Sequence, residues 1–95
     1  MNGPAADRLR PHPDVVSQRL GESGVLIDLR TGRMFELNAT GLRVWELVNE
    51  GCPAGQMLQR LGDEFTGDPD RLRDEVAALL DELVREGLLY AERRG

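Results

Sequence analysis

The sequence has no lysine, one histidine, one cysteine and four aromatic residues among its 95. A single cysteine excludes an intramolecular disulfide, and one Cys with one His cannot supply a zinc cage. His12 lies between two prolines and far along the chain from Cys52, so no activated nucleophile is indicated, and Cys52 is interpreted as a small residue at a helix start. We therefore expect no metal, no cofactor and no enzymatic activity.

The sequence also lacks an apolar run near the roughly 20 residues that span a bilayer, and its N-terminus lacks the continuous apolar core of a secretory signal. We expect a soluble, cytoplasmic protein without a membrane partner. The first 13 residues contain three prolines and almost nothing apolar to bury, which predicts a flexible tail over residues 1–13. The remaining length fits one domain, expected over residues 14–91.

The first half of that domain has the patterns of short strands. Residues 15–20 are a candidate first strand. In residues 25–30, apolar Val25, Ile27 and Leu29 alternate with charged residues, as in a half-buried strand. A turn at Thr31-Gly32 leads to a second arm over residues 33–37, in which Phe35 and Leu37 are expected to face the core while Met34 and Glu36 face away.

The second half has the patterns of three helices. Asn38 is the expected N-cap of a helix that runs through Asn49, with Gly51 as its stop. Pro53 suits the first turn of a second helix that ends near Phe65. A third helix is expected from an Asp68 cap to Gly87, with an apolar face at Leu72, Val76, Leu79, Leu80 and Leu83. Residues 88–90 then pack on the core or add a short strand.

A hairpin with three helices suggests a winged helix-turn-helix, and DNA is then the first candidate ligand. The charge argues against DNA, because the third helix carries six acids and three Arg between Asp70 and Glu86. Asp74, Glu75, Asp81 and Glu82 are interpreted as its solvated face rather than as an acid/base pair. The remaining option is an exposed strand edge that accepts an extended peptide, with residues 33–37 as the candidate edge.

Several segments together resemble one known family. Residues 28–41 read DLRTGRMFELNATG, followed by Val44-Trp45, Leu83 and Gly87-Leu88-Leu89. In this order and spacing, they are similar to the PqqD-like family over about residues 23–90. The Asp-Leu-Arg-Thr-Gly and Leu-Asn-Ala-Thr-Gly segments look closer to the free-standing proteins of lasso peptide clusters than to the protein of pyrroloquinoline quinone assembly.

The resemblance implies an α+β, winged helix-turn-helix-like fold in which a three-stranded antiparallel sheet precedes three helices. It implies a RiPP precursor recognition element, a non-catalytic adaptor that binds the leader of a precursor peptide by strand addition and presents it to modifying enzymes. The implied partners are the leader, a transglutaminase-like cysteine leader peptidase and an asparagine-synthetase-like cyclase. Carried over by position, the candidate peptide-binding residues are Arg33, Met34, Phe35, Glu36, Leu37, Arg73, Asp74, Val76, Ala77, Leu80 and Leu83.

Ordinary packing is the alternative interpretation of several of these residues. For Phe35, Leu37 and Leu83 the primary role is expected to be the core, and Trp45 is expected to anchor the helices on the sheet. Asp74, Glu75 or Asp81 at a groove rim are candidates for pairing with basic leader residues. The alternative functions are a PqqD-type chaperone in pyrroloquinoline quinone biosynthesis, a winged-helix DNA-binding protein, and a purely structural subunit.

Overall fold

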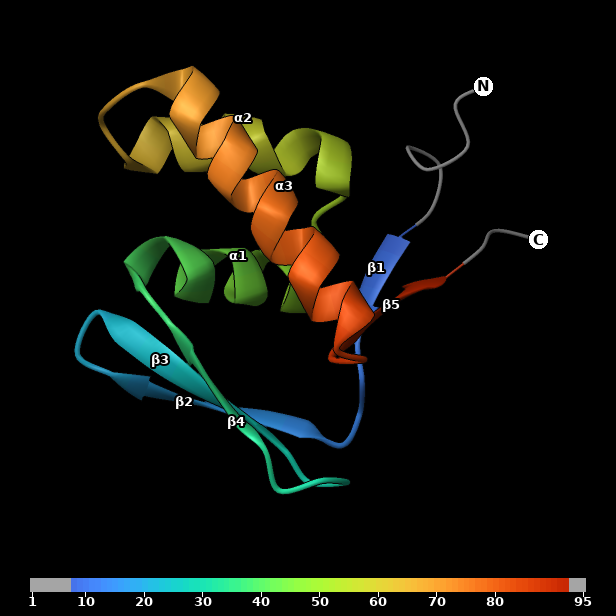
Figure 1. Ribbon diagram of the computed structural model, residues 1–95. Helices are drawn as coiled ribbons and strands as arrows, with labels where there is room; N and C mark the ends of the chain where they lie inside the picture. Colours follow the sequence, from blue (N-terminus) through green and yellow to red (C-terminus); the bar gives the residue numbers. More distant parts are fainter. Residues whose placement is uncertain (1–7, 93–95) are drawn as a thin grey trace.

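A computed structural model describes residues 8–92 and contains a three-stranded sheet followed by three helices (Figure 1). The predicted α+β, winged helix-turn-helix-like fold is thereby confirmed. In chain order the elements are β1 (Arg8–Pro11), β2 (Val15–Leu20), β3 (Ser23–Asp28), β4 (Met34–Leu37), α1 (Ala39–Asn49), α2 (Ala54–Glu64), α3 (Pro69–Arg85) and β5 (Leu89–Glu92).

The main sheet has the order β2-β3-β4 and is antiparallel throughout. The predicted turn between β3 and β4 is present, and Gly32 has a φ of 77°, which a residue with a side chain rarely adopts. Its N–H donates to the Asp28 carbonyl at 2.7 Å. β4 is short, and because no described strand pairs with its other side, it forms an edge of the sheet.

The two faces of the sheet differ in what covers them. In β4, Leu37 is buried and Phe35 half-buried, whereas Met34 and Glu36 are exposed, as predicted. In β3 the prediction that Val25, Ile27 and Leu29 face the core is wrong, and the strand lies two residues earlier than expected. Leu26 and Asp28 face the core instead, and Leu29 is 62% exposed beyond the strand end. A charged residue takes an inward position here because the backbone N–H and the side chain of Arg30 satisfy its carboxylate.

The helices begin where their capping residues predict. The Asn38 Oδ1 accepts from the Gly41 N–H at 2.8 Å, and an Asp68 carboxylate oxygen accepts from the Asp70 N–H at 2.9 Å. Pro53 precedes α2 as its N-cap. Gly87 follows α3 with a φ of 79°, which ends the helix as expected.

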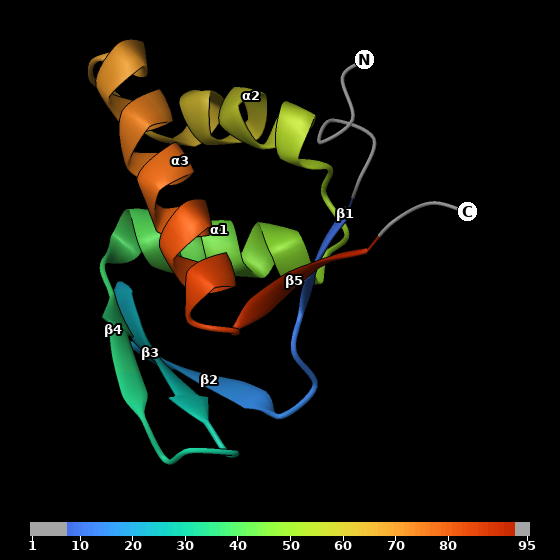
Figure 2. The ribbon, with the colours of Figure 1, turned by 45° about the vertical axis from the view of Figure 1, so that its right-hand side comes forward.

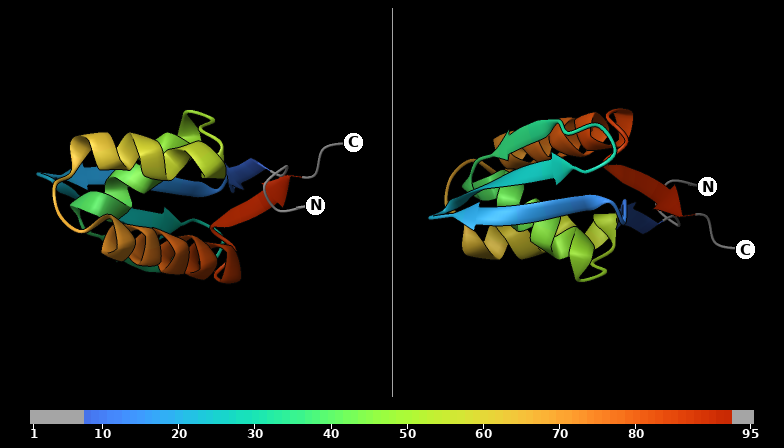
Figure 3. Two further views of the ribbon diagram at one scale, coloured as in Figure 1. Left: turned by 90° about the horizontal axis from the view of Figure 1, so that it is seen from above. Right: turned by 90° about the horizontal axis from the view of Figure 1, so that it is seen from below.

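All three helices lie on one side of the sheet, with α1 directly over it and α2 beyond α1 (Figure 2). Viewed from above and from below, α3 lies on the β4 side of the molecule and α2 lies on the β2 side (Figure 3). The core fills the space between these layers, and Trp45 is buried in it, as expected. Its fully buried members are Leu26, Val44, Leu47, Met57, Leu61, Leu88 and Leu89.

A second, two-stranded sheet includes residues 8–11, which lie within the segment expected to be a flexible tail. β1 pairs antiparallel with β5, so that Arg8 lies opposite Glu92 and Pro11 opposite Leu89. The Arg10 Nε also donates to the Glu92 carboxylate at 2.9 Å. Local composition could not indicate this strand, because its partner is about 80 residues away in sequence. Residues 1–7 of the expected tail lie outside the described residues.

No helix among residues 8–92 combines the length and apolarity needed to cross a membrane.

Candidate functional site

The exposed edge of β4 carries backbone groups that the sheet does not use. The Asp28 N–H donates to the Arg33 carbonyl at 2.9 Å, which marks these two residues as a hydrogen-bonded pair of the antiparallel ladder. Such pairs alternate along a ladder, so the backbones of Phe35 and Leu37 face β3. The N–H and C=O groups of Met34 and Glu36 therefore point to the open edge.

Beyond this edge, a cavity of about 360 Å³ lies between the start of α1 and one flank of α3. One wall is formed at the β4–α1 junction by Asn38, Thr40 and Gly41, directly after the last residue of the strand. The α3 wall alternates carboxylate and apolar groups and consists of Glu75, Val76, Ala78, Leu79 and Glu82. Because Asn38 directly follows β4, we call the cavity together with the adjoining β4 edge the β4–α3 groove.

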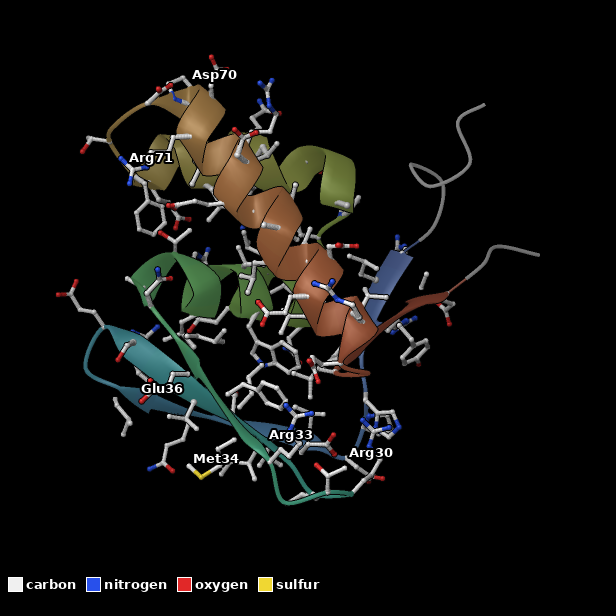
Figure 4. All side chains as sticks on the ribbon, viewed as in Figure 1. Arg30, Arg33, Met34, Glu36, Asp70 and Arg71 are labelled. Carbon is white, nitrogen blue, oxygen red and sulfur yellow. The ribbon has the colours of Figure 1, made fainter. Side chains whose placement is uncertain are left out.

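Arg33 closes one end of the β4–α3 groove. Its Nη1 donates to the Glu86 carboxylate at 2.8 Å, so the side chain crosses from the start of β4 to the end of α3. Its guanidinium carbon also lies 4.9 Å from the centroid of the Phe35 ring. Figure 4 shows Arg33 directed toward the lower end of α3, while Met34 and Glu36 project on the side of the sheet away from the helices. The Arg33–Glu86 pair thus lies at the end of the groove opposite Asn38.

Arg30 fixes the position of the β3–β4 hairpin relative to α3. Its Nη2 donates to the Gly87 carbonyl at 2.8 Å and also to the Asp28 carboxylate at 3.0 Å. Hydrogen bonds from the Arg30 side chain lower the pKa of Asp28 below its usual value. The charged pair therefore joins the two walls of the β4–α3 groove at its closed end.

The predicted strand-side residues all lie at this site, on β4 or just before it. Met34 and Glu36 supply the open edge, Phe35 and Leu37 face the helix side, and Arg33 closes the end.

Of the predicted helix-side residues, only one lines the groove cavity. Val76 lines the groove cavity, and Leu83 is buried in the core. Arg73 lines a separate cavity between α2 and α3, and Asp74, Ala77 and Leu80 do not line the groove cavity. The sequence-based set includes Glu75 only as a rim candidate and omits Ala78, Leu79 and Glu82. Helical periodicity identifies the buried face of α3 but not which of its two flanks lies toward β4.

Cys52 and the acidic residues are the other groups that could carry chemistry. Among residues 8–92, no group of three His, Cys, Asp or Glu side chains is placed to hold a metal ion. Cys52 is half-buried, and its Sγ donates to the Pro53 carbonyl at 3.6 Å. On α3, Asp74, Glu75, Asp81 and Glu82 are all exposed, so the helix presents negative charge to solvent.

Two solved structures share this fold. TbiB1, solved in complex with the TbiA(beta) leader peptide, is 29% identical, with a TM-score of 0.76 over 87% of this chain and 99% of that chain. A lasso peptide synthetase B1 complexed with its leader peptide is 23% identical, with a TM-score of 0.75 over 87% of this chain and 98% of that chain. No curated protein sequence matches the chain.

The family comparison covers β3 through the start of β5. Residues 23–89 match the model of coenzyme PQQ synthesis protein D, PqqD. The matched segment is well over half of the 95 residues and contains β4, α3 and therefore both walls of the β4–α3 groove. This chain is a member of the PqqD family.

Proposed function

We propose that this chain is a non-catalytic adaptor that binds the leader of a ribosomally synthesised precursor of a lasso peptide. The leader adds to β4 as a further strand and occupies the β4–α3 groove. The adaptor then presents the precursor to a leader peptidase of the transglutaminase-like cysteine class and to an asparagine-synthetase-like cyclase.

The unused edge of β4 carries this proposal. An exposed strand edge binds an extended peptide through backbone hydrogen bonds, and adjacent cavities select its side chains. Here the edge groups of Met34 and Glu36 lead along β4 to Asn38, which lines a cavity of about 360 Å³. The two similar structures, both complexes with leader peptides, support the same class of ligand.

An adaptor also needs a surface that stays accessible when the leader is bound. The face of the sheet away from the helices exposes Val16, Leu20 and Met34. Val16 lies opposite Ile27 and Ile27 opposite Met34, so an apolar row crosses all three strands and ends at the β4 edge. Exposed apolar patches of this kind are typical of protein interaction sites, and we assign this face to the leader peptidase.

Two alternatives make different predictions. A chaperone of the precursor in pyrroloquinoline quinone assembly uses the same kind of groove, and membership of the PqqD family favours it. A winged-helix DNA-binding protein requires a basic recognition helix, whereas α3 exposes carboxylates that repel phosphates. The three functions therefore differ in the ligand that the protein is expected to bind.

The test is calorimetric titration of the protein with three ligands: the leader of a lasso precursor encoded beside its gene, a pyrroloquinoline quinone precursor peptide and duplex DNA. We expect the lasso leader alone to bind, with a Kd between about 1 μM and 1 nM. No binding of that leader at high micromolar concentration would contradict the proposal. Binding of duplex DNA that weakens with salt would favour the winged-helix alternative.

Strand addition itself is tested by replacing Glu36 with proline. The Glu36 N–H points to the open edge, so proline removes a hydrogen-bond donor for the guest while the β3–β4 ladder keeps its bonds. We expect Glu36→Pro to weaken leader binding about tenfold or more. Glu36→Ala keeps the N–H and serves as the control. Equal binding by the two variants would exclude backbone pairing at this position.

A further inference from the structure

Two carboxylates line the α3 wall of the β4–α3 groove, whereas several carboxylates elsewhere in the helical layer are held in ion pairs. Glu46, Glu50 and Glu64 all pair with Arg43, and Glu86 pairs with Arg33. Among residues 8–92, no Arg lies within ion-pair distance of Glu75 or Glu82. Both nevertheless line the cavity beside the open edge of β4.

The wall between these carboxylates is apolar. Glu75 and Glu82 are seven residues apart, which places them two helical turns apart on one flank of α3. Val76, Ala78 and Leu79 line the cavity between them. A surface of this kind suits a side chain with an aliphatic stem and a cationic end, because the stem covers apolar atoms while the charge reaches the carboxylates.

The start of α1 on the opposite wall contributes charge of the other sign. A helix N-terminus carries roughly half a positive charge, and one of its N–H groups is already occupied by the Asn38 side chain. Two carboxylates carry two full negative charges when ionised. The field in the cavity is therefore negative overall, and it favours a cationic guest rather than an anionic one.

The position of this guest residue follows from the pleat of the sheet. Side chains on neighbouring strands that lie opposite each other point to the same face. Leu37 points to the helix side and is followed directly by Asn38, which lines the cavity. A guest residue opposite Leu37 therefore directs its side chain into the cavity.

We propose that the β4–α3 groove selects a leader segment with Lys or Arg at the inward position opposite Leu37, held between Glu75 and Glu82. This inference rests on the proposed adaptor function and adds to it the chemical class of the recognised residue. Arg33 and Glu86 block the other end of the groove, so they limit the register in which the basic residue can reach this position.

The test compares two double variants of the whole chain. Glu75→Gln with Glu82→Gln removes the cavity charge and preserves side-chain shape. Asp74→Asn with Asp81→Asn removes the same charge from positions that are also seven residues apart on α3 but do not line the cavity. Binding is measured with the synthetic leader used above, and with versions of it in which each Lys or Arg is changed singly to norleucine.

We expect the Glu75/Glu82 variant to bind the leader about 3- to 10-fold more weakly than the unsubstituted protein at low salt. The difference should shrink at high salt, and the Asp74/Asp81 variant should bind like the unsubstituted protein. One norleucine substitution should remove the difference between the unsubstituted protein and the Glu75/Glu82 variant.

Failure of this inference and failure of the adaptor function would give different results. Equal leader binding by both double variants would overturn this inference and leave the adaptor function standing. Failure of the unsubstituted protein to bind the leader would overturn the adaptor function and this inference with it. Thermal melts of both variants show whether either one has lost its fold.

Discussion

At the scale of single residues, Asp28 holds the hairpin that carries the β4 edge. Its carboxylate is buried and accepts from the backbone N–H and the side chain of Arg30, which in turn donates to the Gly87 carbonyl. These bonds lower the pKa of Asp28 in the folded state. A carboxylate with a lowered pKa stabilises the fold above its unfolded pKa of about 4, and this contribution is lost as the pH falls toward the folded pKa.

Asp28→Asn is therefore expected to lower the melting temperature at pH 7. The difference from the unsubstituted protein should stay constant down to about pH 4 and shrink below it, because the unsubstituted protein then also loses the charge. Calorimetric melts between pH 3 and pH 7 measure this trend. Asp63→Asn removes a carboxylate from an exposed position and is the control. A pH-independent difference would show that the charge of Asp28 does not act through Arg30.

At the scale of elements, the phase of β3 decides which face of the sheet meets the core. Leu26 has no exposed surface, whereas Leu29 is 62% exposed just past the strand. Leu26→Ala is expected to lower the free energy of unfolding by about 2–5 kcal/mol because it leaves a cavity. Leu29→Ala is expected to change it by less than about 0.5 kcal/mol. Urea denaturation measures both, and the opposite order would contradict the orientation of the strand.

β3 also shows why an alternation of apolar residues does not always identify the buried face of a strand. Val25, Ile27 and Leu29 form a regular apolar series in the sequence, yet the outer face of the sheet carries Val25 and Ile27. Asp28 can face inward only because Arg30, two residues later, folds back on it. Burial of a charge depends on such a partner, and periodicity cannot detect the partner. In β4 no such exception occurs, and the predicted facing of Phe35 and Leu37 is confirmed.

At the scale of the whole molecule, the proposed adaptor uses two surfaces that meet at β4. In this proposal the leader occupies the β4–α3 groove, and the apolar outer face of the sheet is left for the peptidase. Val16→Thr combined with Leu20→Thr changes exposed residues on β2, the strand farthest from the groove. We expect leader affinity to stay within about twofold, which is the effect usual for surface substitutions.

In the same variant we expect cleavage of the leader by the peptidase to slow. A time course of precursor cleavage, with leader affinity measured in parallel, separates the two surfaces. Cleavage at the rate of the unsubstituted protein would exclude the β2 side of the sheet as the docking face.

The sequence alone determined the order of the main elements, because their signals are local. Asn38 and Asp68 cap the helices that follow them, Gly32 and Gly87 adopt the turns that need a positive φ, and Phe35 and Leu37 face inward. The tertiary structure alone decided the pairing of β1 with β5 and the flank of α3 that lies toward β4. Both depend on contacts between residues far apart in sequence, so composition and periodicity along the chain do not contain them.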